Sequence, residues 1–114
     1  MRSNQISVQE LAHLLKNPNH VYLLDVRSAE ERAILHLGGE WIPLPQLNER
    51  LSELPQDKCI VIYCRSGYRS QLAVEMLEQL GWAQVKNLTG GILAWQSYQA
   101  PSEGIVNVCE KEKS

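Results

Sequence analysis

Residues 61–70, Val61-Ile62-Tyr63-Cys64-Arg65-Ser66-Gly67-Tyr68-Arg69-Ser70, form the stretch that decides the fold. An apolar, β-branched run ends at a cysteine, and a short loop with one glycine and two arginines leads into a helical pattern at residues 71–80. The pattern predicts a strand, an anion-binding turn and a helix. Converging backbone N–H groups and the positive end of the helix dipole favour negative charge in such a turn. Because the thiolate is the charged form of cysteine, we expect Cys64 to be a reactive nucleophile.

Strand and helix patterns alternate along the rest of the chain. Apolar runs at residues 21–26, 41–44 and 59–63 predict strands, the stretch 85–88 predicts one more short strand, and residues 105–108 are a candidate edge strand. Helical spacing of apolar residues predicts helices at residues 8–16, 28–33, 46–54, 71–80 and 92–96. This alternation is typical of an α/β fold with a mainly parallel central sheet of about five short strands, flanked by helices on both faces.

The composition indicates one ordinary globular domain. The 114 residues, with 44% hydrophobic and 21% charged side chains, are expected to form a single domain with its core in residues 6–97 and a C-terminal tail at 98–114. A net charge of -2 without a Lys/Arg-rich block gives no electrostatic case for nucleic acid or a membrane surface as a partner. The three cysteines form neither a C-x-x-C pair nor a zinc pattern. Free thiols and the lack of a signal-peptide pattern predict a cytoplasmic protein without a metal site.

Four motifs in order along residues 6–97 carry a resemblance to a known family. They are Asp25-Val26-Arg27, His36-Leu37-x-Gly39 with Ile42-Pro43-Leu44, Cys64-Arg65-Ser66-Gly67-x-Arg69-Ser70, and Leu88-x-Gly90-Gly91-x-x-Ala94-Trp95. Together they resemble a single-domain rhodanese, a rhodanese-like sulfurtransferase. The resemblance implies the rhodanese-like fold and a persulfide on Cys64. The sulfur would come from thiosulfate or a protein persulfide and pass to a thiophilic acceptor, without a metal or organic cofactor.

The length of the loop separates this family from its relatives. Cys64 to Arg69 spans six residues. By resemblance, six residues suit sulfur, whereas related cell-cycle phosphatases and arsenate reductases carry a seventh and accommodate a tetrahedral oxyanion. Sulfur transfer is therefore the leading hypothesis, and a phosphatase or arsenate reductase is the least favoured one. Tyr68 brings an aromatic ring to the variable loop position instead of another positive charge, which predicts weak use of thiosulfate.

A second hypothesis, of a different class, is a sulfur-relay or binding module whose role is to meet a partner protein. The segment around His36 departs from the usual family pattern, since Leu35 replaces a glycine, Glu40 replaces an alanine, and the stretch up to Ile42 is one residue short. The form Leu-Gly-Gly-x-x-Ile-Pro-Leu resembles rhodanese modules fused to adenylylating enzymes of cofactor sulfuration. That resemblance implies a protein acceptor in a sulfur relay, with any thiosulfate activity incidental.

The resemblance also implies roles for individual residues. With Cys64 as the catalytic nucleophile, the residues expected to contact the substrate are Arg65, Ser66, Gly67, Tyr68 and Arg69. The residues expected to support the site are Asp25, Arg27 and Ser70. We expect Asp25 to pair with Arg69 or Arg65, because a carboxylate at the end of a strand would otherwise be desolvated and unpaired. Arg27 is expected in a structural ion pair, and Ser70 either donates its hydroxyl to the persulfide or caps the following helix.

Other residues with reactive or aromatic side chains have less specific expectations. Cys59 is expected to pack within its strand, and Cys109 in the tail is either a resolving or acceptor thiol or a cysteine without a role. His36 matches a structural family position, so we do not expect it to act as a base. Trp95 is expected in the core, and Trp41 is a candidate contact for a partner.

Overall fold

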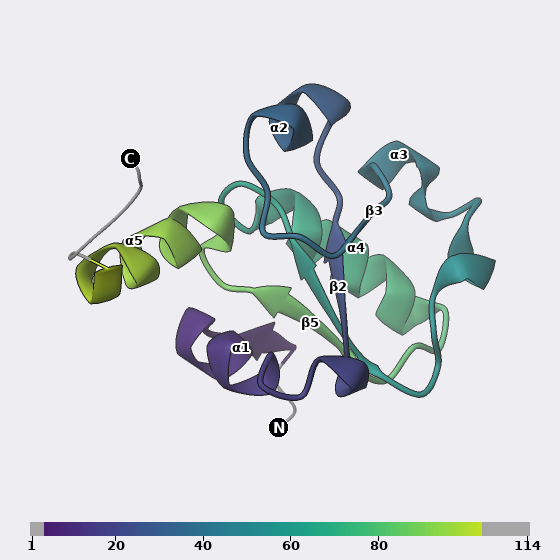
Figure 1. Ribbon diagram of the computed structural model, residues 1–114. Coiled ribbons are helices and arrows are strands. Elements are labelled where there is room, and N and C mark those ends of the chain that lie inside the picture. The colour runs from purple at the N-terminus through teal and green to yellow at the C-terminus, as the bar shows by residue number, and fades with distance from the viewer. Residues whose placement is uncertain (1–3, 104–114) are drawn as a thin grey trace.

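The computed structural model describes residues 4–103 and has a five-stranded sheet at its centre (Figure 1). The strands are β1 (Gln5–Ile6), β2 (Val21–Asp25), β3 (Glu40–Trp41), β4 (Cys59–Tyr63) and β5 (Val85–Leu88). Their order across the sheet is β1-β5-β4-β2-β3, and every pair is parallel. The parallel α/β architecture predicted from the sequence is therefore confirmed.

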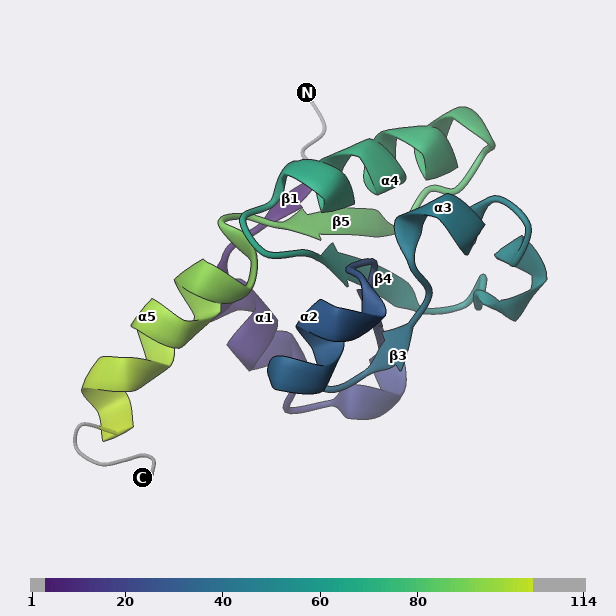
Figure 2. The same ribbon diagram turned by 90° about the horizontal axis from the view of Figure 1, so that it is seen from above.

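Helices cover both faces of this sheet (Figure 2). The helices α3 (Leu44–Leu47) and α4 (Tyr68–Gln79) lie on one face, and α1 (Val8–Leu14) and α5 (Gly91–Glu103) lie on the other. Along β4, Ile60 and Ile62 join the core cluster under α3 and α4, while Val61 and Tyr63 join the cluster that includes Leu11 of α1. This alternation follows the two-residue period of a strand, and it explains why β4 is apolar throughout.

The remaining helix, α2 (Ala29–Ile34), lies beyond the carboxyl end of β2 (Figure 1). Ser28 is its N-cap, as a serine directly before acidic residues predicts, and forms a capping box with Glu31. No residue of α2 is buried. Among the described residues, no helix is long and apolar enough to cross a membrane.

Several predicted boundaries are wrong for identifiable reasons. The helix predicted at 46–54 is the short α3 followed by a 3₁₀ turn at Leu51–Glu53. Pro43 and Pro45 fix the backbone at the start of the helix, so α3 begins at Leu44 instead of residue 46. It ends at Leu47. The edge strand β1 was not predicted, because two residues carry no readable alternation. Residues 105–108 and Cys109 lie outside the described residues.

The helices near the loop are also longer than predicted. Helix α4 starts at Tyr68, and its buried stripe is Ser70, Ala73, Val74 and Leu77. The helical spacing of apolar residues over 71–80 also predicts Leu72 and Leu80 in this stripe, but their side chains are exposed. The spacing i, i+3, i+4, i+7 was masked because the first member of the stripe is the polar Ser70. Helix α5 runs to Glu103, beyond the predicted end at residue 96.

Candidate active site

Cys64 lies directly after β4, at the carboxyl edge of the parallel sheet, where open α/β folds usually bind ligands. The side chain is almost fully buried. Gly67 is the N-cap of α4 and has a φ of 105°, a left-handed conformation that favours glycine. This turn brings the Gly67 N–H to 3.1 Å from the sulfur, to which it donates a hydrogen bond. The loop therefore curves around Cys64.

Several donors converge on the Cys64 sulfur. The backbone N–H of Ser70 lies 3.4 Å from Sγ and the Ser70 hydroxyl lies 3.3 Å from it. Burial raises the pKa of the thiol, but the hydrogen bonds from Ser70, Gly67 and the Ser66 N–H outweigh burial, and the net pKa lies below that of an ordinary cysteine. The site thus stabilises the thiolate, which is the nucleophilic form.

The Ser70 hydroxyl links Cys64 to a residue that the sequence analysis missed. Its oxygen also lies 2.5 Å from the side-chain oxygen of Asn87 in β5. A hydroxyl has one proton, so Ser70 donates to Asn87 or to Cys64 at any moment. Asn87 is buried, and its amide donates to Gln5 in β1. The sequence carries no clear signal for this role, because Lys86 beside it in the short strand is also polar. The prediction that Ser70 caps α4 is wrong, because Gly67 occupies that position.

Helix α5 contacts the other side of the loop. The N–H groups of Ile92 and Leu93 donate to the carbonyl oxygens of Cys64 and Arg65, at 2.9 and 3.1 Å. These are first-turn N–H groups of α5, which have no partner within their own helix. The contact requires Gly91, since a Cβ there would lie 2.5 Å from the carbonyl oxygens of Cys64 and Arg65. The Gly90-Gly91 motif thus fixes the start of the loop.

The expected partner of Asp25 is wrong. Asp25 is fully buried and binds Arg27 through two side-chain bonds of 2.9 Å and the Arg27 N–H, also at 2.9 Å. Arg32 of α2 lies 3.2 Å from the same carboxylate. Arg27 is only two residues away, so its backbone and side chain satisfy Asp25 locally. The expected structural ion pair of Arg27 is confirmed.

Arg69 instead pairs with Glu31 of α2. Both terminal nitrogens of its guanidinium donate to the two carboxylate oxygens of Glu31 at 2.8 Å. Pairing with Arg69 lowers the pKa of Glu31 to about 2. In the sequence, Glu31 is only one of two acidic residues in the first turn of a short helix, which favours a solvated position. Its role could not be inferred without the position of α2 relative to α4.

The other predicted loop residues face outward. The side chains of Arg65, Ser66 and Tyr68 are exposed, and Tyr68 reaches 72% exposure. Among the described residues, Arg65 makes no ion pair. These side chains are therefore available at the surface of the loop that holds the buried sulfur.

The remaining chemically interesting residues lie outside the loop. Cys59 is half-buried and packs against the core, and burial raises the pKa of its thiol. His36 is exposed, and its Nδ1 accepts the N–H of Gly38. Trp95 packs against the core cluster as predicted, and the Trp41 indole N–H donates to the Arg27 carbonyl at 2.8 Å. Among the described residues, no cluster of three or more His, Cys, Asp or Glu side chains could hold a metal ion.

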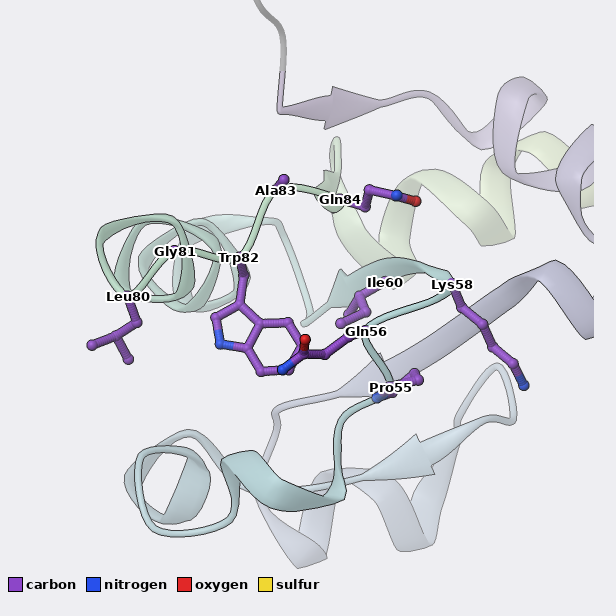
Figure 3. A pocket seen from close by; sticks show the side chains of 9 residues that line it. All are labelled: Pro55, Gln56, Lys58, Ile60, Leu80, Gly81, Trp82, Ala83 and Gln84. Carbon is purple, nitrogen blue, oxygen red and sulfur yellow. The ribbon is translucent and has the colours of Figure 1, made fainter.

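A separate pocket lies at the opposite end of the strands (Figure 3). It has a volume of about 270 Å³ and is lined by residues that include Ile60 at the start of β4 and Trp82 before β5. The Lys58 side chain points away from Trp82 and Gln56. None of the residues around Cys64 lines this pocket. It is therefore not part of the candidate site.

The sequence profile of the rhodanese-like domain family matches residues 7–98. The chain belongs to this family. The match covers the loop, the Asp25 cluster and the Gly90-Gly91 turn, so the resemblance inferred from the four motifs is confirmed.

Known relatives agree with this assignment. A sulfurtransferase of Allochromatium vinosum is 39% identical over 104 residues, which cover 86% of this chain and 92% of the relative. The probable adenylyltransferase/sulfurtransferase MoeZ of Mycobacterium tuberculosis is 35% identical over 88% of this chain, but this chain spans only 26% of MoeZ. The solved structure of the human single-domain sulfurtransferase TSTD1 is similar to this rhodanese-like domain with a TM-score of 0.74, at 27% identity, over 84% of this chain and 97% of the human chain. The family and its relatives support sulfur transfer in general.

Proposed function

We propose that this rhodanese-like domain is a sulfurtransferase that carries a sulfane sulfur as a persulfide on Cys64. The observation that carries the proposal is the set of N–H and hydroxyl donors around a buried thiol whose pKa is lowered. Such donors stabilise the attacking thiolate, and the same turn suits an anionic terminal sulfur. No separate general base is required, because the thiol is already in an environment that favours ionisation.

The reaction has two balanced half-reactions. In the first, the Cys64 thiolate attacks the outer sulfur of thiosulfate; an S–S bond forms at Cys64, the S–S bond of thiosulfate breaks, and sulfite leaves with that bonding pair. With a protein persulfide as donor, the leaving group is the donor thiolate. In the second, a thiolate acceptor attacks the terminal sulfur and takes it as its own persulfide, which regenerates the Cys64 thiolate. Sulfur is neither lost nor gained over the cycle, and no external oxidant or reductant enters it.

The direct test is mass spectrometry of the Cys64 peptide after the protein reacts with thiosulfate or an organic persulfide. We expect a gain of about 32 Da, one sulfur atom, on Cys64. The Cys64→Ser variant should lose both the adduct and the transfer activity. The matched control is Cys59→Ser, which removes the thiol whose pKa burial raises and should keep both. Retention of full activity by Cys64→Ser would refute the proposal.

A sulfur-relay role for the same cysteine is the second candidate. It is favoured by relatives whose names join an adenylyltransferase to a sulfurtransferase, such as MoeZ and the uba4 protein of Ogataea parapolymorpha. In that case the acceptor is a protein, and turnover with cyanide is slow while transfer to the partner is fast. Measuring transfer from the Cys64 persulfide to cyanide and to candidate carrier proteins separates the two. Hydrolysis of an aryl phosphate that is lost in Cys64→Ala would instead support a phosphatase.

A further inference from the structure

The positive charge of Arg69 is already engaged at the edge of the anion-binding loop. Its guanidinium donates two parallel hydrogen bonds of 2.8 Å to Glu31, which is the two-bond geometry of strong arginine–carboxylate pairs. Pairing with Glu31 raises the pKa of Arg69, and a charge on Cys64 raises it further. Arg69 thus interacts electrostatically with a charge on the sulfur, but its two terminal nitrogens donate their hydrogen bonds to the Glu31 carboxylate.

Glu31 is held in this position by the start of its own helix. One of its carboxylate oxygens also accepts hydrogen bonds from the backbone N–H and the hydroxyl of Ser28, both at 3.1 Å. These contacts and the Arg69 pair fix the carboxylate from two sides. Because Glu31 remains ionised above a pKa of about 2, its negative charge is a permanent feature of the site at neutral pH.

The surface beside this ion pair is mostly apolar. A cavity of about 490 Å³ has Arg69 in its wall. Most of its lining is apolar and includes Trp41, Pro43 and Leu44, and Arg27, Ser28 and Gln46 contribute polar groups. The apolar part of this lining suits the carbon skeleton of an organic or peptide group. Arg69 therefore joins the Glu31 carboxylate on one side to a mostly apolar surface on the other.

We infer that Glu31 is a specificity-determining residue that selects organic or protein persulfides over small dianionic sulfur donors. The inference rests on the proposed sulfur transfer at Cys64 and names the donor class. A fixed carboxylate repels the two charges of thiosulfate more strongly than the single charge of an alkyl persulfide. It also removes Arg69 as a ligand for the sulfonate group. Arg65 remains as the exposed cation of the loop.

The substitution that tests this inference is Glu31→Gln, because glutamine keeps the shape of the side chain and also serves in a capping box. The control is Glu30→Gln, which removes one negative charge from the neighbouring, exposed position of the same helix. The two donors are thiosulfate and the persulfide of N-acetylcysteamine, which carries no charge other than that on its sulfur. The measured quantity is the second-order rate constant for loading of Cys64 by each donor.

We expect Glu31→Gln to raise the rate constant for thiosulfate about tenfold and to change that for the alkyl persulfide less than about threefold. The gain should shrink as ionic strength increases, which a purely structural role would not produce. Glu30→Gln should leave the ratio of the two rate constants within about twofold of the wild type. An unchanged ratio in Glu31→Gln, or an equal change in Glu30→Gln, overturns the inference while loading of Cys64 still supports the proposed function. If neither donor loads Cys64 in the wild type, both proposals fail.

Discussion

At the scale of single residues, the reactivity of Cys64 depends on the residues that donate hydrogen bonds to it, above all Gly67 and Ser70. Gly67 contributes a backbone N–H that any residue in the same conformation would supply, whereas Ser70 contributes a hydroxyl as well. The sequence suggested a reactive cysteine and a serine near it, because both belong to the loop motif. It could not reveal that Asn87 competes for the same hydroxyl proton, because Asn87 lies 17 residues after Ser70, in β5. That competition depends on the register of β5 against the loop.

Replacing Ser70 with alanine is expected to raise the pKa of the Cys64 thiol, because one donor to the thiolate is lost. A single hydrogen bond is worth about 1 kcal/mol, so alkylation of Cys64 by iodoacetamide at pH 7 should slow about fivefold. The pH profile of alkylation should move to higher pH. Ser66→Ala is the matched control, since Ser66 acts on the thiol through its backbone N–H, which alanine retains. An identical profile for wild type and Ser70→Ala would show that the hydroxyl does not stabilise the thiolate.

At the scale of secondary-structure elements, the loop is held between the start of α4 and the start of α5. The sequence predicted strands β2 and β4 and helices α4 and α5, because each has a run or a helical spacing of several apolar residues. It also predicted the short strand β5. The break in the helix predicted at 46–54 could not be predicted. The leucine spacing favours one helix from residue 46, whereas the prolines at 43 and 45 start a shorter helix at Leu44. The two-residue strand β1 exists only through its pairing with β5, which is a tertiary contact.

Gly91 is a position at which this arrangement of elements does not tolerate a side chain. With a φ of 62°, it lets the first turn of α5 approach the loop carbonyls, and an added methyl group would collide with backbone atoms. We expect Gly91→Ala to lower the free energy of unfolding by about 2–4 kcal/mol and to reduce loading of Cys64. Gly81→Ala separates the two effects, because Gly81 has a φ of 100° but nothing within 4 Å of its added Cβ. It should cost only about 1 kcal/mol in urea unfolding. Equal costs for the two variants would mean that the contact with the loop is unimportant.

At the scale of the whole molecule, α2 is attached by charged groups instead of buried side chains. It contributes no buried residue, and its links to the rest of the domain include the Glu31–Arg69 pair and the contacts of Arg32 with Asp25 and the Gly39 carbonyl. The sequence predicted the helix and its cap, since both are local. It did not predict which arginine meets which carboxylate, because five charged side chains from three segments converge and only the packed fold decides their pairing.

This attachment predicts a dependence of stability on acid. The pKa of Glu31 is about 2 in the folded protein and near 4.5 when the chain is unfolded, so the unfolded state binds the proton more readily. The contribution of Glu31 is therefore complete above pH 4.5 and is lost as the pH falls toward 2. Since the pair is about one-third exposed, solvent screening reduces its worth to about 1 kcal/mol. Urea unfolding of wild type and Glu31→Gln should differ by this amount at pH 7 and converge below pH 3.

In an Arg69→Gln background the same substitution should lose most of this pH dependence, because Arg69 is the main cause of the low pKa of Glu31. A difference that persists unchanged down to pH 2 would mean that the ion pair does not hold α2 in place.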